Sequence, residues 1–231
     1  MEAVVLAGGF GARLQSSVKD LPKPMAPVHG KPFLTRVLNY LRESGVSRFI
    51  LSVGYKYETI QGYFGNEYRS TPIVYAVEKI PLGTGGGIKR SLEMAGSSPV
   101  LVVNGDTFFD VDLDDLLATH RDRKADMTMA VKYMDDLGRY GSVVFDESGR
   151  LISFREKGQH EAGYVNGGLY VIEKDLFAPF ALPPAFSFET DFMEVHLKDL
   201  KVHVRPYEGY FIDIGLPGDY EKAQQELSRF D

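Results

Sequence analysis

Four short runs of apolar residues, rich in Val, Ile and Leu, constrain the fold of this chain more than any other feature. They cover Ala3–Leu6, Arg48–Val53, Ile73–Val77 and Val100–Val103. Continuous apolar runs of this length are typical of strands that are covered on both faces of a sheet. Between the first two runs, apolar side chains recur at helical spacing over Phe33–Leu41. The alternation predicts an α/β fold with a Rossmann-like, mostly parallel and doubly wound sheet.

The pattern changes after Asp126, where shorter strand-like segments follow one another closely. We expect further strands over Met127–Tyr133, Ser142–Phe145, Leu151–Phe154, Tyr164–Ile172, Lys201–Arg205 and Tyr210–Ile214, and further helices over Thr59–Phe64, Ile88–Met94, Phe188–Leu200 and Gly218–Phe230. No linker or internal repeat interrupts the 231 residues. The chain therefore predicts one domain over residues 1–231, whose second half adds a small β subregion and one wall of a cleft.

The composition excludes several classes of function. A net charge of −6 argues against nucleic acid or an anionic membrane as the main partner. The absence of cysteine excludes disulfides, thiolate metal sites and a cysteine nucleophile, and the scattered histidines indicate no zinc site. The first predicted strand begins at Glu2, and no apolar run approaches the length of a membrane span. We therefore expect no signal peptide, no membrane anchor and a cytoplasmic location.

The first apolar run ends in a glycine-rich loop that carries two cations. This loop consists of Leu6, Ala7, Gly8, Gly9 and Gly11, followed by Arg13 and by Lys23 between two prolines. Glycine backbones approach phosphate oxygens closely, and Arg and Lys bind them. The loop is not a dinucleotide fingerprint, because Leu14 stands where the third glycine belongs, and the chain has no P-loop with Gly-Lys-Ser/Thr. We predict a binding site for a nucleoside triphosphate.

Two aspartates stand at the ends of predicted strands. Asp106 follows Val100–Val103 within Asn104-Gly105-Asp106, and Asp213 lies in the last predicted strand. In open α/β sheets, ligands bind beyond the carboxyl ends of the strands. A single aspartate at such a place is more often a turn-former, but two beside a cationic phosphate loop favour a metal site. Mg²⁺ prefers oxygen ligands, usually one or two carboxylates plus substrate phosphates, so it is the expected cofactor.

Six motifs, in order along the chain, resemble those of the sugar-1-phosphate nucleotidyltransferases. They read LAGGFGARL…LPKP, PLGTGGGI, NGD, REK, VNGG and FIDIGLPGDY. The resemblance implies an enzyme with a Rossmann-like fold that joins a sugar 1-phosphate to a nucleoside triphosphate and releases pyrophosphate. The segments RLQSSVKDLPKPMAP, LSVGYKYE and NGDTFFDVDL look like those of members that use GTP and a heptose 1-phosphate for bacterial surface polysaccharide. Mannose 1-phosphate guanylyl transfer, amino-sugar 1-phosphate uridylyl transfer and a non-catalytic nucleotide-binding relative are the alternatives.

The resemblance also assigns roles to residues. It makes Arg13, Lys23 and Asp106 catalytic, and it places Asp106 and Asp213 on Mg²⁺. The implied nucleotide-binding residues, mainly within residues 1–125, are Leu6, Ala7, Gly8, Gly9, Gly11, Arg13, Lys23, Glu78, Leu82, Gly83, Thr84, Gly105 and Asp106. The implied sugar-phosphate-binding residues, within residues 126–231, are Tyr140, Gly141, Glu156, Lys157 and Asn166, with Glu189 and Asp191 as further candidates for the same wall. The oligomeric state stays open, with a homodimer possible.

Glu78 gives a physical argument about the base. Several thymidylyl- and uridylyl-transferring relatives have Gln where this chain has Glu78. An ionised carboxylate only accepts hydrogen bonds, and guanine offers two adjacent donors, whereas uracil and thymine offer a donor beside an acceptor. Glu78 therefore favours GTP. The alternative is an exposed Glu at a strand end, with main-chain groups of Leu82–Gly85 reading the base.

Overall fold

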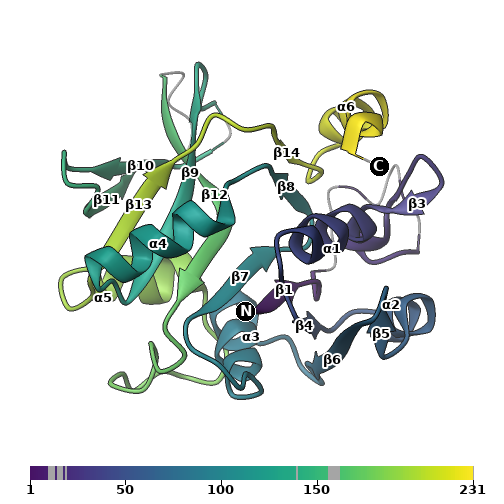
Figure 1. Cartoon of the computed structure of the whole chain (residues 1–231), viewed down its shortest axis with the longest axis horizontal. Coiled ribbons are helices and arrows are strands. Elements are labelled where there is room, and N and C mark those ends of the chain that lie inside the picture. The colour runs from purple at the N-terminus through teal and green to yellow at the C-terminus, as the bar shows by residue number, and fades with distance from the viewer. Residues whose placement is uncertain (10–13, 15–17, 19, 139, 156–161, 231) are drawn as a thin grey trace.

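A ten-stranded sheet forms the centre of the computed structural model, which describes residues 1–9, 14, 18, 20–138, 140–155 and 162–230 (Figure 1). Its parallel part has the order β7-β1-β4-β6, in which β1 (Glu2–Leu6) lies between β4 (Arg48–Val53) and β7 (Val100–Asn104), and β6 (Thr71–Val77) follows β4. The short β5 (Glu67–Tyr68) pairs antiparallel with β6 at the edge. The four predicted apolar runs are thus the four adjacent parallel strands.

Helices cover both faces of this parallel part. On one face, Phe33 and Leu34 of α1 (Phe33–Glu43) and Ile60 of α2 (Tyr57–Phe64) belong to the same core as Val5. On the other face, α3 (Gly83–Leu92) belongs to a second core, which contains Val4. Successive residues of one strand therefore enter opposite cores, which is why the strand is apolar throughout.

The second half extends the same sheet with antiparallel strands. The long β12 (Gly163–Ile172) pairs with β7 through its last four residues, and along its other side with β9 (Met127–Met134). The remaining strands are β10 (Ser142–Phe145), which joins β12 to β11 (Leu151–Arg155), and β13 (Val202–Pro206), which is parallel to β9. The predicted strands of this half are confirmed within one or two residues. Strands β1, β4–β7 and β9–β13, from both halves, thus hydrogen-bond into one sheet.

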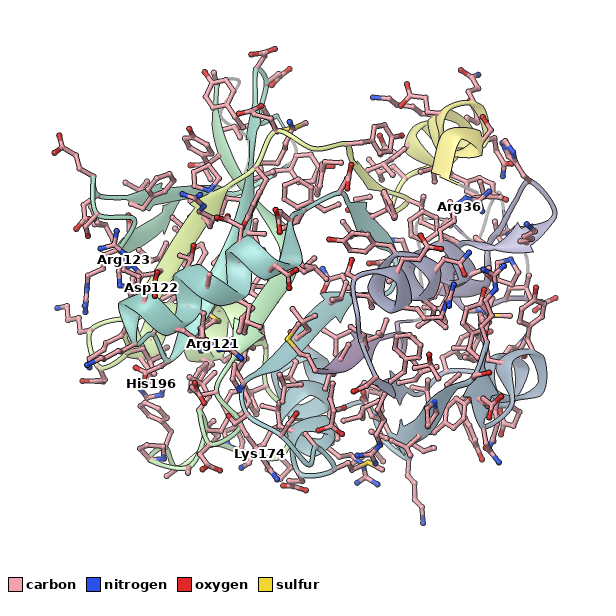
Figure 2. All side chains as sticks on the ribbon, viewed as in Figure 1. Arg36, Arg121, Asp122, Arg123, Lys174 and His196 are labelled. Atoms are coloured by element: carbon pink, nitrogen blue, oxygen red, sulfur yellow. The ribbon has the colours of Figure 1, made fainter. Side chains whose placement is uncertain are left out.

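Helix α4 (Leu113–Arg123) packs beside β9 and β13. The aspartate-rich segment before it caps this helix. The Asp112 carboxylate accepts a hydrogen bond from the main-chain N of Asp115 at 3.0 Å, which caps the helix. Acidic residues occupy its first turn, while Arg121 and Arg123 occupy its last (Figure 2). This charge order complements the helix dipole.

Two helices differ most from their predicted bounds, whereas the last predicted helix, Gly218–Phe230, is α-helical over Pro217–Glu226 and ends in a 3₁₀ turn. Helix α3 begins at Gly83 rather than at Ile88, because its glycines pack against the segment before residue 188. A Cβ on Gly85 would lie only 2.2 Å from the ring of Phe186. The predicted helix over Phe188–Leu200 is a π-helix over Phe188–Met193 (η3), followed by a single short turn, α5 (Glu194–His196).

The remaining elements are short, except for the last helix. They are a 3₁₀ turn over Lys23–Met25 (η2), the hairpin β2 (Pro27–Val28) and β3 (Lys31–Pro32), the pair β8 (Thr107–Phe109) and β14 (Phe211–Asp213), and α6 (Pro217–Glu226) with the final 3₁₀ turn Leu227–Phe230 (η4). Buried Arg36 on α1 donates a hydrogen bond to the Val28 carbonyl at 3.0 Å, which joins the hairpin to α1 (Figure 2). Within the described parts of the chain, no helix combines the length and apolarity that a bilayer crossing requires.

Glu2 ties the amino end of β1 to its surroundings. Its side chain is only 10% exposed; Oε1 accepts from Arg48 at 2.6 Å, and Oε2 accepts from the main-chain N atoms of Gly96 and Ser97 at 2.6 and 2.8 Å. Burial alone would raise the pKa of Glu2, but these hydrogen bonds outweigh burial and lower its pKa.

Glu2→Gln is expected to lower the free energy of unfolding by about 1–3 kcal/mol at pH 7, because charge-assisted hydrogen bonds are lost. The carboxylate's contribution is present above its ordinary pKa of 4.5 and is lost as the pH falls through the lower folded-state value. Urea unfolding should therefore give a difference from wild type that is constant above pH 4.5 and shrinks below it. The exposed Glu147→Gln is the control, and a difference that persists in acid would contradict the assignment.

Candidate functional site

Asp106 and Asp213 are brought together by a short pair of strands. Asp106 immediately precedes β8, and β14 pairs antiparallel with β8 so that Asp213 lies opposite Thr107. The main-chain N of Ile214 donates to the Asp106 carbonyl at 3.1 Å and extends this pairing. Two aspartates that are 107 positions apart in the sequence thereby share one place at the carboxyl edge of the sheet.

Lys23 lies between these two carboxylates. Its Nζ donates to Asp106 Oδ2 at 2.6 Å and to Asp213 Oδ1 at 3.1 Å, and the Lys23 side chain is only 11% exposed. Burial alone would lower the pKa of Lys23, but the two negative charges and their hydrogen bonds outweigh burial and raise it. Pro24 and Met25 are buried beneath the turn, which fixes the backbone that carries the lysine. We call Lys23, Asp106 and Asp213 the cation centre.

The described glycine-loop residues lie at the same edge. Gly105 donates its main-chain N–H to the Leu6 carbonyl at 2.9 Å, which holds the end of β1 beside the end of β7. Ala7 is buried, and its main-chain N–H donates to Ser52 of β4 at 2.8 Å. Gly8 lies against the backbone of β4 and the Glu78 carboxylate, whereas the space above Gly9 is open. The predicted phosphate loop thus begins where the ends of the parallel strands meet.

Glu78 follows β6 and is held by two hydrogen bonds. Oε1 accepts from Ser52 Oγ at 3.1 Å, and Oε2 accepts from the main-chain N of Leu82 at 2.9 Å. Each carboxylate oxygen can accept more than one hydrogen bond, so Glu78 keeps the capacity to bind a base while it is oriented by these partners. Both carboxylate oxygens are therefore bonded within the protein, whereas the alternative interpretation expected an exposed Glu at a strand end.

The start of α3 connects the two halves of the chain. The Leu82 carbonyl accepts from the main-chain N of Phe186 at 2.9 Å, and Thr84 Oγ1 accepts from that of Phe188 at 2.9 Å. Gly85 in turn donates to the Phe186 carbonyl at 3.0 Å. Several polar groups predicted to face the nucleotide therefore hold the segment that leads into η3. Gly83, the first residue of α3, has a φ of +69°, a backbone conformation that glycine tolerates.

A cavity of about 590 Å³ adjoins the cation centre. It is lined by Asn104, Thr107, Tyr140, Gly141, Phe154, Asn166, Gly168, Glu189, Thr190, Glu194, Phe211 and Asp213. The structure thus brings the predicted sugar-binding residues Tyr140, Gly141 and Asn166 to one cavity with the predicted metal ligand Asp213. Asp191 is not among the lining residues; its carboxylate accepts from the main-chain N of Ser187 at 2.7 Å and stabilises the start of η3.

The VNGG motif forms an irregularity in β12. The pairing register with β9 shifts between Asn166 and Tyr170, and Gly168 has a φ of +67°. A Cβ on Gly167 would lie 2.4 Å from the ring of Phe109. These glycines therefore meet a structural requirement of the strand, whatever else they contact.

Four predicted site residues, Gly11, Arg13, Glu156 and Lys157, lie outside the residues that the structure describes. Among the described residues, sequence reasoning missed Thr190 and Glu194 on the cavity wall and Ser52 as the partner of Glu78. A helical reading of Phe188–Leu200 does not place Glu194 on the face of Glu189, and Ser52 lies within an apolar strand. A larger cavity of about 890 Å³ lies at the amino end of the strands, near Met1 and Pro99, and none of its described lining residues is a predicted site residue.

The comparisons with known proteins agree with this geometry. Residues 2–229 match the model of the nucleotidyl transferase family. The chain is 47% identical over 230 residues to the D-glycero-alpha-D-manno-heptose 1-phosphate guanylyltransferase of Aneurinibacillus thermoaerophilus, with 100% of each chain covered. It is 46% identical over 220 residues to the Campylobacter jejuni protein of the same name, with 95% of this chain and 97% of the relative covered.

A solved structure is similar over the same extent. HddC from Yersinia pseudotuberculosis, complexed with GMP-PN, has a TM-score of 0.86 and 36% sequence identity, with 98% of this chain and 99% of that chain covered. The predicted resemblance to sugar-1-phosphate nucleotidyltransferases and the predicted Rossmann-like fold class are confirmed. The protein belongs to the nucleotidyl transferase family of enzymes.

Proposed function

We propose that the protein transfers a GMP group from GTP to D-glycero-α-D-manno-heptose 1-phosphate and so forms a GDP-heptose and pyrophosphate. Two relatives with nearly half of their residues identical to this chain carry the name of that activity. The observation that carries the proposal is the position of Asp213, which bonds to Lys23 and also lines the cavity of the predicted sugar-binding residues. A buried lysine, two carboxylates that could hold a metal ion, and a polar cavity meet there, as a reaction between two phosphorylated substrates requires.

The reaction needs positioning and charge stabilisation more than proton transfer. An oxygen of the sugar phosphate attacks the α-phosphorus of GTP, a new P–O bond forms, and the bond to the β-phosphate oxygen breaks as pyrophosphate leaves with the electron pair. The attacking oxygen is already anionic near neutral pH, so no general base is required. The Lys23 ammonium supplies fixed positive charge near the reacting phosphates. Arg13 and Lys157 are proposed to add to it.

The donor set of the cation centre fits a magnesium ion. Two carboxylates converge on one positive charge, the Lys23 ammonium, and carboxylate oxygens are ligands that Mg²⁺ prefers. No third acidic or histidine side chain joins them in the described part of the chain, so substrate phosphates and water would complete the coordination of the ion. Asp106 and Asp213 would hold the ion, which supplies charge neutralisation on phosphate oxygens when bound.

The choice of GTP is assigned to Glu78. Glu78→Gln replaces one accepting oxygen by a donor group, which suits uracil and thymine better than guanine. We expect the ratio of kcat/KM for GTP to that for UTP to fall by about tenfold or more, the equivalent of one hydrogen bond. Initial rates with both nucleotides measure the ratio. The exposed Glu147→Gln in the β10–β11 turn is the control and should leave the ratio unchanged. An unchanged ratio in Glu78→Gln would show that Glu78 does not read the base and only binds the main-chain N of Leu82.

The activity itself is tested by a matrix of nucleotides and acceptors. GTP, UTP, dTTP, CTP and ATP are each combined with D-glycero-α-D-manno-heptose 1-phosphate, mannose 1-phosphate and N-acetylglucosamine 1-phosphate, and pyrophosphate release is followed with and without Mg²⁺. The proposal predicts the highest kcat/KM for GTP with the heptose and little turnover without the ion. A clear preference for mannose 1-phosphate, or no pyrophosphate with any pair, would refute it. We further propose one cytoplasmic domain over residues 1–231 that supplies surface polysaccharide synthesis.

A further inference from the structure

The wall of the cavity formed by η3 and α5 presents two carboxylates. Glu189 and Glu194 both line the cavity, together with Thr190 between them. Phe188, Phe192 and Met193 of the same segment are buried in the core on the opposite side. The segment therefore has an apolar face in the protein and an acidic face on the cavity. In the described part of the chain, Lys23 forms its ion pairs with Asp106 and Asp213 and not with this acidic face.

The π-helical turn is what places the two carboxylates on one face. The main-chain N–H of Glu194 donates to the carbonyl of Glu189, five residues earlier. In an α-helix, residues five apart point in widely different directions, because one turn takes 3.6 residues. The wider π turn brings them into line, and such turns are frequent at functional sites. The π-helical turn, a rare conformation, thus places Glu189 and Glu194 together on the cavity wall.

Asn166 holds one member of this pair. Its Nδ2 donates to Glu189 Oε1 at 2.7 Å and to Tyr170 Oη at 2.6 Å, while its Oδ1 accepts from the main-chain N of Gly168 at 3.0 Å. Both N–H groups of the amide are therefore used within the protein. Asn166 was predicted to bind the sugar and also lines the cavity, and its hydrogen bond to Glu189 orients that carboxylate at the cavity wall.

We propose that Glu189 and Glu194 accept hydrogen bonds from hydroxyl groups of the acceptor sugar and determine acceptor specificity, with Asn166 as the positioning residue. The inference rests on the proposed function, since the cavity must hold a sugar 1-phosphate. Carboxylates only accept hydrogen bonds, so the pair selects uncharged hydroxyl groups on the part of the sugar beside it. The same charges repel an acceptor that carries a second anionic group on the part of the sugar beside them.

Glu189→Gln and Glu194→Gln test both consequences. The Kd of D-glycero-α-D-manno-heptose 1-phosphate, measured by calorimetry, and its KM should rise by about tenfold to a hundredfold in each variant, because a hydrogen bond to a charged group is weakened. The KM for GTP should stay within about twofold of wild type. The Kd of mannose 1,6-bisphosphate should instead fall by about tenfold, since a repulsive charge is removed. A variant that is merely damaged would not gain affinity for this bisphosphate.

Asn166→Ala is combined with Glu189→Gln in a double-mutant cycle. If Asn166 acts through Glu189, the double variant should bind the heptose 1-phosphate no more weakly than Glu189→Gln alone. Glu147→Gln, an exposed change in the β10–β11 turn, is the matched control and should alter neither Kd. Unchanged Kd values for both ligands in the Gln variants, or an equal rise in the KM for GTP, would overturn the inference. Absence of pyrophosphate from the wild type would refute the proposed function alone, because the calorimetric series is independent of turnover.

Discussion

Lys23→Ala is expected to lower kcat/KM for pyrophosphate formation by about 10²–10³-fold, the effect of losing one aligned charge donor in such a site. Lys23 is the only cation bonded to Asp106 and Asp213 in the described part of the chain. Its removal takes positive charge from the place where the two phosphorylated substrates must meet. Steady-state kinetics with saturating Mg²⁺, and single-turnover rates to separate chemistry from product release, would measure the loss.

The loss should not arise from unfolding. The turn that carries Lys23 is held by the buried Pro24 and Met25, so its backbone does not depend on the ammonium group. The two carboxylates, 30% and 32% exposed, can take up water or a metal ion when the lysine is gone. Lys132→Ala on β9, which removes an ion pair with Glu208, is the matched control and should keep full turnover. Near-normal activity of Lys23→Ala would remove this residue from the catalytic centre.

The parallel half of the fold was predictable because its physical cause is local. Each of the first four residues of β7, from Val100 to Val103, enters one of two cores, so four consecutive positions must be apolar. The helical spacing of the apolar residues of α1 was sufficient to predict which side of this helix is buried. Strand ends follow directly from these runs, and the polar residues after them, Asp106 and Glu78, were identified for that reason.

The convergence of Asp106 and Asp213 was predictable only in outline. Both were identified as strand-end aspartates, but their meeting depends on the pairing of β8 with β14, two strands of three residues each. Strands this short carry too few side chains for a distinct pattern, and their pairing is long-range. The bridge made by Lys23 is a tertiary arrangement as well, since the lysine comes from a turn near the N-terminus.

The sugar side shows the clearest limit of sequence reasoning. The motif around Asn166 was found, but not that both amide N–H groups are used inside the protein. The π-helix was not predicted, because its apolar residues Phe188 and Phe192 have ordinary α-helical spacing and only the packing of the helix against its neighbours selects the wider turn. The main-chain groups of Leu82–Gly85 were likewise predicted to contact the base, but the sequence did not show that Gly85 packs against the ring of Phe186.

Asp213→Asn is the second change with a large expected effect, about 10² or more in kcat at a fixed, low Mg²⁺ concentration. The amide keeps the shape of the carboxylate and can still accept from Lys23 and from the main-chain N of Gly215, which now donates to Asp213 Oδ1 at 2.7 Å. The fold should therefore be retained, and the change removes one negative charge from the cation centre. The exposed Asp122→Asn on α4 serves as the control (Figure 2).

Magnesium titration separates two roles of Asp213. If the carboxylate serves as an ion ligand, the Mg²⁺ concentration for half-maximal rate should rise by about tenfold or more in Asp213→Asn, and high Mg²⁺ should restore part of the activity. Lys23→Ala should show no such rescue, because the lost group is a cation near the phosphates rather than a ligand. If Asp213 acts only by anchoring Lys23, the two variants should respond alike to Mg²⁺, and the magnesium site would have to be placed elsewhere.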